Sequence, residues 1–271
     1  MFPKHFRIAC FAVGLLLWLP VVATAQRTDT KSRQKSNYPP PLEVYKGRVI
    51  AQTMHYTGAE WLTRDSREQE ERCSLMLASL GVKPGMSICD MGCGNGFYTV
   101  QMAKMVGPTG HVYGVDVQPE MLKMLNDRAD KAEVTNISPI LGTYINPRLP
   151  KGKIDLILCV DVYHEFSYPE QMLAAMRDAL SPNGTVVLVE FRAEDPNVPI
   201  KPEHKMTKAQ IMLELPPNGY KLVHEFDKLP WQHMMWFGRD EAFVPPEKDP
   251  DPPPTKGRKT PTKQRTGSSV K

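Results

Sequence analysis

A glycine-rich loop behind an acidic residue is the most distinctive chemical feature of this chain. In the segment ICDMGCGNGFYT an apolar run ends in an acid, and glycines follow at every second position. The residues concerned are Asp90, Gly92, Gly94 and Gly96. Glycines let the backbone adopt positive φ values and approach a ligand closely, and the helix expected to follow offers free N–H groups at its start. The loop therefore predicts a binding site for a small ligand.

The glycine spacing and a second acid narrow the class of ligand. A dinucleotide-binding loop reads G-x-G-x-x-G, but here Phe97 stands where its third glycine would be. A P-loop ends in G-K-[ST], and this loop contains no lysine. Asp116 ends the next apolar run, HVYGVD, at a position suited to holding two ribose hydroxyls. Because an acid beside the loop opposes a pyrophosphate, we expect an adenosine ligand that is cationic or zwitterionic.

A second group of polar residues follows a later apolar run, in the segment VDVYHEF. His164 can act as a general base at neutral pH, or it can pack against or cap the loop. Tyr163 can shape a substrate pocket or serve as an aromatic wedge. Glu190 and Arg192 end another apolar run, and we expect them to pair with each other at the rim rather than contact substrate. Trp61 and its neighbours form either a lid over the ligand or a packed N-terminal helix.

Strand-like and helix-like patterns alternate around these residues. Strands are expected at Ser87–Asp90, His111–Asp116, Ile137–Leu141, Ile154–Val160 and Thr185–Phe191. Helices are expected at Ser66–Leu80, Tyr98–Met105, Pro119–Lys131 and Tyr168–Leu180. This order predicts an α/β fold with a Rossmann-like, doubly wound, parallel sheet. After a short helix at Lys208–Leu215, a hairpin of Tyr220–Phe226 and Gln232–Gly238 is expected to add an antiparallel strand near the C-terminus.

Taken together, these motifs resemble the strand-end motifs of class I S-adenosylmethionine-dependent methyltransferases. The segments that carry the resemblance are ICDMGCGNG, VDVQPEML, IDLILCVDVYHEF and SPNGTVVLVEF. It covers about Arg64 to Arg239, and the set is specific as a whole although each motif alone is weak. The segment that leads into it, YKGRVIAQTMHYTGAEWLTRDSREQEE, is similar to a bacterial subgroup, exported or membrane-anchored, of unknown substrate.

The resemblance implies roles for individual residues around S-adenosylmethionine as the cofactor. The residues implied for its methionine part and ribose edge are Asp90, Gly92, Gly94 and Gly96. Asp116 would bind the ribose hydroxyls and Val117 would flank the adenine. Thr143 stands where many relatives have an acid that meets the adenine amine, so this chain departs from the family pattern at that contact. Asp161 would face the methyl-donor pocket, and together with His164 it forms the candidate catalytic pair.

The two ends of the chain differ in composition from its centre. Residues 1–25 have a basic start, an apolar run and small residues at Ala23 and Ala25, which is the layout of a secretory signal; the alternative is a membrane anchor through residues 8–25. Residues 26–43 read as a flexible linker and residues 244–271 as a Pro-rich, basic, disordered tail. The methyltransferase domain is therefore expected at residues 44–243. An exported or periplasmic protein is expected, with anchoring to the inner membrane as the alternative.

The charge distribution argues against a nucleic-acid-binding domain. The net charge is +4, but each end segment, residues 1–43 and residues 244–271, carries +4 by itself, so the centre is mildly acidic. A nucleic-acid-binding domain more often carries its own basic face. Cys89 and Cys159 lie in apolar runs and read as core residues, and the spacing of Cys89 and Cys93 does not suit zinc. No metal site is expected.

Three functions remain open at this point. The first is methylation of a small-molecule acceptor, with S-adenosylmethionine as cofactor. The second is a catalytically inactive domain of the same fold that binds an adenosine metabolite or a partner, which the export signal makes serious because the methyl donor is made in the cytoplasm. The third, a nicotinamide-dependent oxidoreductase, is disfavoured by Phe97. Acceptor atom and oligomeric state do not follow from the sequence.

Overall fold

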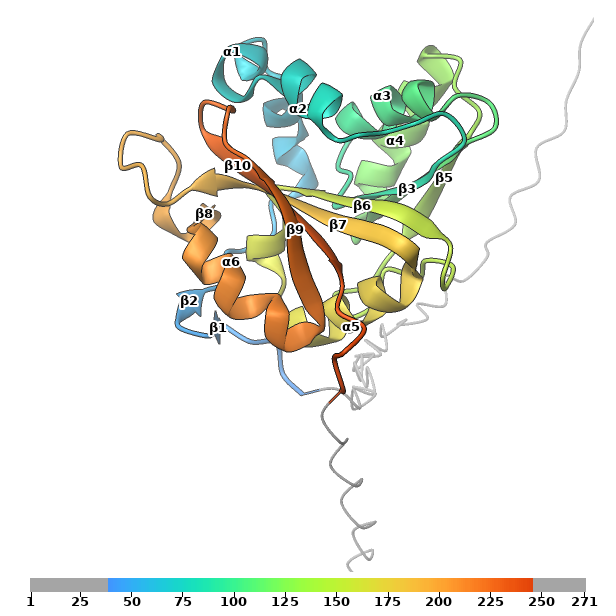
Figure 1. Cartoon of the computed structure of the whole chain (residues 1–271). Coiled ribbons are helices and arrows are strands. Elements are labelled where there is room, and N and C mark those ends of the chain that lie inside the picture. Colours follow the sequence, from blue (N-terminus) through green and yellow to red (C-terminus); the bar gives the residue numbers. More distant parts are fainter. Residues whose placement is uncertain (1–38, 246–271) are drawn as a thin grey trace, which may run out of the picture. The chain divides into compact units, whose positions relative to one another are not determined.

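The computed structural model describes residues 39–245 of the chain (Figure 1). The expected signal or anchor segment, most of the expected linker and nearly all of the expected tail lie outside these residues. Within residues 39–245, no helix combines the length and the apolar character needed to cross a membrane.

An eight-stranded mixed sheet forms the centre of the fold, in the order β5-β4-β3-β6-β7-β10-β9, with β8 beside β7. Its strands are β3 (Ser87–Met91), β4 (His111–Asp116), β5 (Ile137–Leu141), β6 (Ile154–Val160), β7 (Leu180–Arg192), β8 (Lys205–Met206), β9 (Tyr220–Phe226) and β10 (Gln232–Arg239). Neighbours from β5 to β7 are parallel, whereas β10 is antiparallel to both β7 and β9. The α/β fold class and its antiparallel C-terminal strand are therefore confirmed.

Helices cover both faces of the sheet (Figure 1). They are α1 (Arg67–Glu71), α2 (Cys73–Ser79), α3 (Phe97–Val106), α4 (Pro119–Lys131), α5 (Pro169–Ala179) and α6 (Lys208–Glu214). Alternate residues of β6 point to opposite faces: Leu158 packs in the cluster that contains α2 and α3, and Ile157 packs in the cluster that contains α5 and α6. Because both faces are buried, β6 can be an almost unbroken apolar run.

The helix expected at residues 66–80 is instead broken in two at Arg72. Arg72 adopts a left-handed conformation with φ of 52°, which ends α1 and begins α2. The break changes the direction of the buried side chains: Arg67 and Glu71 of α1 line a cavity, whereas Met76 of α2 packs in the core. Apolar residues at helical spacing do not by themselves distinguish one long helix from two short helices that pack against different partners.

A small hairpin precedes the main domain and is attached to it by a buried ion pair. Its strands are β1 (Val44–Tyr45) and β2 (Arg48–Val49). The Arg48 guanidinium donates to both carboxylate oxygens of Glu214 in α6, at 2.8 and 3.0 Å, and to the backbone oxygen of His164 at 2.8 Å. Tyr163 donates its hydroxyl to Glu214 as well, at 2.7 Å. This network fixes the N-terminal segment against the loop that follows β6.

The strand order reverses between β3 and β6. The chain leaves β3 toward β4 on one side, and it returns from β5 to β6 on the other side. At such a reversal the two connections diverge and leave a crevice at the carboxyl ends of the strands. The glycine loop follows β3 and Asp161 follows β6, so both open onto this crevice.

Candidate active site

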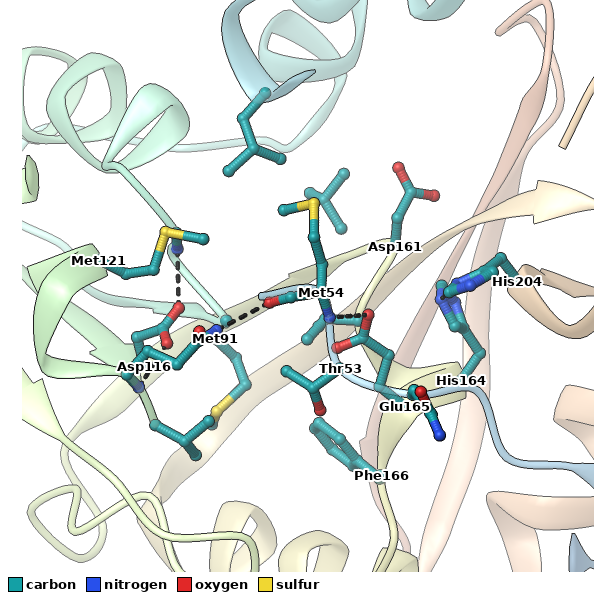
Figure 2. Close-up of a pocket in the computed structure, with 18 of the residues that line it drawn as sticks. Thr53, Met54, Met91, Asp116, Met121, Asp161, His164, Glu165, Phe166 and His204 are labelled. Carbon is teal, nitrogen blue, oxygen red and sulfur yellow. Dashed lines mark hydrogen bonds between the residues drawn. The ribbon is translucent and has the colours of Figure 1, made fainter. Parts of the chain in front are cut away.

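A cavity of about 770 Å³ occupies this crevice. Its floor comes from the ends of β3, β4 and β6, and its rim comes from residues 52–62 and residues 199–204. Figure 2 shows Asp116 at one end of the cavity and His164 with His204 at the other, with Met91, Met54 and Asp161 between them. Its volume is within the usual range for small-molecule sites.

The glycine loop is held tightly between β4 and the N-terminal segment. Gly92 and Cys93 donate their backbone N–H groups to the backbone oxygen of Val115, at 2.8 and 2.9 Å. Gly94 has a φ of 52°, and a Cβ atom added to it would lie 2.5 Å from Cδ1 of Leu62. A larger residue at this position would therefore displace the end of the Leu62 side chain. Gly92 and Gly94 both line the cavity.

Asp116 ends β4 and is held in a fixed orientation by the backbone around it. Its Oδ2 accepts from the N–H of Gly94 at 3.0 Å and its Oδ1 from the N–H of Gln118 at 2.8 Å. Burial raises the pKa of this carboxyl, although the backbone hydrogen bonds oppose that shift. Asp116, Val117 and Thr143 all line the cavity, and for these three residues contacts to the adenosine part of the cofactor stay a prediction.

Asp90 and Gly96, which the sequence also suggested for the cofactor, are not among the residues that line the cavity. Asp90 is buried and accepts a hydrogen bond from the Thr99 hydroxyl at 2.5 Å, so it ties the start of α3 to β3. Burial raises the pKa of Asp90 to about 6. A Cβ atom on Gly96 would lie 2.4 Å from Cδ1 of Leu125, so Gly96 allows α4 to pack against the loop.

Asp161 faces the centre of the cavity with one oxygen uncommitted. Its backbone has a φ of 52°, and its Oδ2 accepts from Gln232 Nε2 at 2.6 Å. Its Oδ1 is buried and has no hydrogen-bond partner among the residues that the structure describes. Burial raises the pKa of this carboxyl, and the nearby Glu71 and Glu190 carboxylates add to the shift. A buried oxygen without a donor indicates a position where a ligand donates.

His164 is buried and contacts Glu190 rather than solvent. Its Nδ1 lies 2.6 Å from Oε2 of Glu190, and Oε1 of Glu190 accepts from the Tyr163 N–H at 3.0 Å. The expected pair of Glu190 with Arg192 is wrong, since Arg192 pairs with Asp227 at 3.3 Å. Sequence position near the rim of the sheet did not reveal that Glu190 faces the loop after β6.

Two further polar residues at this end were not singled out from the sequence as site residues. His204 Nδ1 lies 3.1 Å from His164 Nε2, and burial together with the charge of His164 lowers the pKa of His204. Glu165 accepts from the Met54 N–H at 3.3 Å, and burial raises its pKa to about 7. One ligating atom from each of His164, Glu165 and His204 lies within 4.8 Å of the others. Glu165 adjoins His164 in the sequence, but no local signal identifies His204.

The N-terminal segment closes one side of the cavity. Ala51 donates its N–H to the backbone oxygen of His164 at 3.2 Å, and Gln118 contacts both Met54 O and Tyr56 N, at 2.9 and 2.8 Å. The segment continues into a 3-10 helix, Tyr56–Thr63. Trp61 lies on it and lines the cavity while remaining half exposed. Of the two alternatives for Trp61, the structure shows a short N-terminal helix beside the cavity, and its part as a lid stays a prediction.

Comparison with known sequences assigns the chain that forms this site to a family. A sequence model for the family described as "Methyltransferase domain" matches residues 82–239, more than half of the chain. The matched region contains the glycine loop, Asp116, Asp161 and His164. The N-terminal segment that lines the cavity, residues 52–62, precedes the matched region.

Individual relatives agree with this match over shorter lengths. A protein-L-isoaspartate O-methyltransferase of Methanothrix thermoacetophila is 38% identical over 69 residues, 26% of this chain and 33% of that protein. A demethylmenaquinone methyltransferase of Listeria welshimeri is 27% identical over 118 residues, 44% of this chain and 49% of that protein. The chain thus spans between a third and a half of the length of these relatives.

A solved structure shares the fold over most of its own length. It is a SAM-dependent methyltransferase from Aquifex aeolicus, which superimposes with a TM-score of 0.64 at 24% sequence identity. The match covers 68% of this chain and 98% of the Aquifex chain.

Proposed function

Because this chain belongs to the methyltransferase-domain family, whose typical methyl donor is S-adenosylmethionine, we propose that it methylates a small organic acceptor. The nucleophilic atom of that acceptor carries a proton which it must lose. Asp116 marks the nucleoside end of the cavity, and the group of His164, Glu165 and His204 marks the acceptor end. The observation that carries the proposal is the placement, along one continuous cavity, of Asp116 and of the Asp161 oxygen that has no partner within the described part of the chain.

Asp116 at the nucleoside end and Asp161 further along the cavity both fit S-adenosylmethionine. The Asp116 carboxylate is already oriented by two backbone N–H groups, and each of its oxygens has a remaining lone pair for a ribose hydroxyl. The Asp161 Oδ1, buried and without a donor among residues 39–245, suits the ammonium group of the methionine part. When bound there, the cofactor supplies an electrophilic methyl group on a positively charged sulfur.

The chain's own residues then have to align the acceptor and manage its proton. His164 is oriented by Glu190 through Nδ1, so its Nε2 is directed toward His204 and the acceptor end of the cavity. At that position the imidazole can accept the acceptor's proton. Much of the cavity is apolar, with Met54, Met91 and Phe166 in its lining, which excludes water from the reacting atoms. Because cofactor and acceptor share about 770 Å³, a small acceptor is favoured.

The compartment is proposed on sequence grounds alone. The layout of residues 1–25 supports export or anchoring to the inner membrane. Cell fractionation of the full-length chain, with detection of residues 26–271, tests this separately from the activity.

Ligand binding tests the proposed function before the acceptor is known. The ligand is S-adenosylhomocysteine, the demethylated product, with NAD as the control. At about one hundred times its Kd, a ligand adds about 2.7 kcal/mol to the free energy of unfolding, which raises the Tm of a domain of this size by about 5–10 °C. We expect that shift with S-adenosylhomocysteine, little or none with NAD, and its loss in Asp116→Ala.

The other outcomes are equally informative. If neither ligand raises the Tm, the chain is an inactive or repurposed member of the fold. A shift with NAD alone would overturn the methyltransferase proposal.

A further inference from the structure

Two imidazoles and a carboxylate converge at the acceptor end of the cavity (Figure 2). His164 belongs to the turn after β6, whereas His204 belongs to a turn just before β8. Their Nε2 and Nδ1 atoms lie 3.1 Å apart, and the two rings are nearly perpendicular, at 88°. The Glu165 carboxylate lies beside them, with a ligating atom of each of the three within 4.8 Å of the others.

We propose that His164 Nε2, His204 Nδ1 and the Glu165 carboxylate together bind one divalent transition-metal ion of the zinc type. Two imidazoles and one carboxylate form a ligand set that such ions take in proteins, in the catalytic arrangement of three protein ligands and one open position.

The spacing of the two histidines already suits such an ion. Nitrogen ligands lie about 2.0–2.1 Å from zinc in a tetrahedral site, which places two of them about 3.3 Å apart. The observed 3.1 Å between His164 Nε2 and His204 Nδ1 is close to that separation, so the rings need little movement. Among residues 39–245 the Glu165 carboxylate accepts the Met54 N–H at 3.3 Å. One of its oxygens already lies within 4.8 Å of a ring nitrogen of each histidine, so we expect a change of its side-chain rotamer to bring it to the third ligand position.

Glu190 supplies the outer contact that metal-binding histidines usually make. Such a histidine donates the N–H of its other ring nitrogen to a carboxylate, which fixes the ring and raises its basicity. Here Nδ1 of His164 lies 2.6 Å from Oε2 of Glu190, and both side chains are buried. The proton is thereby held on Nδ1, and the Nε2 lone pair is left for the ion. The carboxylates of Glu165 and Glu190 also balance the two positive charges of the ion.

This inference rests on the proposed function for its chemical consequence and changes the part that His164 plays. All three ligands line the cavity, so the open position of the ion faces the acceptor. A hydroxyl bound there has a lowered pKa, as water does on zinc, and gives its proton to water as the acceptor enters, before the apolar cavity excludes water from the reacting atoms. His164 then holds the ion instead of taking the proton itself.

Direct metal titration tests the site without an acceptor. The full-length protein, purified without a histidine tag and treated with EDTA, is titrated with Zn²⁺ by calorimetry and with Co²⁺ by visible absorption. We expect one ion per chain and a Co²⁺ spectrum typical of four ligands. His204→Ala should weaken Zn²⁺ binding by at least about 100-fold, and Glu190→Gln by about 10–100-fold. His224→Ala removes an exposed imidazole from β9 and should leave the affinity unchanged.

Binding of S-adenosylhomocysteine, measured on the same samples, separates the two proposals. In His204→Ala it should be retained, which also shows that the variant is folded. Failure of the wild type to bind Zn²⁺, or equal binding by wild type and His204→Ala, overturns the metal site and leaves a hydrogen-bonded histidine pair. Zn²⁺ binding without S-adenosylhomocysteine binding would support the metal site and overturn the proposed methyl donor.

Discussion

His164 and Glu190, which are far apart in the sequence, form a buried pair in which Nδ1 and Oε2 lie 2.6 Å apart. The contact exists because β6 and β7 are parallel neighbours whose carboxyl ends lie side by side. It decides which nitrogen of His164 carries the proton, and hence which one is presented to the cavity.

Glu190→Gln should move that proton. Oε1 of Glu190 accepts from the Tyr163 N–H, so the amide oxygen of a glutamine is held there and its NH₂ group turns toward Nδ1. A donor facing Nδ1 forces the proton of the neutral imidazole onto Nε2. Long-range ¹⁵N–¹H NMR of the imidazole should show Nδ1–H in the wild type and Nε2–H in the variant. Finding the same tautomer in both would show that Glu190 does not set it.

Asp161→Asn should stabilise the free protein and lower its affinity for S-adenosylhomocysteine. The variant removes a buried carboxylate whose Oδ1 has no partner among the described residues, and asparagine tolerates the positive φ at this position. Each kcal/mol gained raises the Tm by about 2–4 °C, and loss of a hydrogen bond to a charged group lowers affinity for S-adenosylhomocysteine by about 10–100-fold. Thermal denaturation and calorimetry measure the two effects. An unchanged affinity would mean that Asp161 does not contact the ligand.

Gly94→Ala should affect binding more than Gly152→Ala, although both glycines have positive φ. The strain of alanine at positive φ costs about 1 kcal/mol. At Gly94 the new Cβ would also lie 2.5 Å from Leu62, whereas at Gly152 it meets nothing within 4 Å. The end of the flexible Leu62 side chain can shift at little further cost in the free energy of unfolding, but this shift moves the cavity wall, so binding of S-adenosylhomocysteine should weaken several-fold. Equal effects of the two variants would contradict this contact.

Asp90 should make the fold less stable as the pH rises from about 4 to about 6. Its folded pKa is raised to about 6 by burial, so between these values the folded chain binds more protons than the unfolded chain, and the free energy of unfolding falls by up to about 3 kcal/mol. Asp90→Asn keeps an acceptor for Thr99 and should lose this slope. The free energy of unfolding of Asp90→Asn, relative to that of the wild type, should rise between about pH 4 and about pH 6 and stay constant at higher pH.

Urea denaturation at several pH values measures this difference. Asp127→Asn, on the exposed side of α4, controls for the loss of one negative charge. If the difference in free energy of unfolding between Asp90→Asn and the wild type does not vary with pH, the pKa of Asp90 is not raised in the folded chain.

The central sheet could be predicted because its signals are local. The near-continuous apolar run Ile154–Val160 has the composition of a strand buried on both faces, and the alternation of such runs with helical patterns dictates parallel pairing. Asp116 could be placed at the cavity for the same reason, since it ends one of those runs. The break between α1 and α2 at Arg72 could not be predicted, because it depends on what these two helices pack against.

The acceptor end of the site was only partly predictable. His164 was identified from its place after a strand, but its two partners come from β7 and from the turn before β8. Parallel order alone puts the end of β7 beside the end of β6, so Glu190 could have been assigned to His164 by topology. His204 could not be assigned in this way, since its position depends on the short pairing of β8 with β7. No pattern in the sequence predicts that pairing.

The rim formed by residues 52–62 has a consequence for how this protein can acquire new substrates. The floor of the cavity lies in residues that match the shared family region, whereas Met54, Trp61 and Leu62 precede that region and line the cavity from outside it. Substitutions there reshape the space beside the reacting atoms and leave Asp116, Asp161 and the residues beneath them unchanged. Under the proposed function, selectivity for the acceptor can therefore change through the side chains of Met54 and Trp61, in a segment only about a dozen residues long.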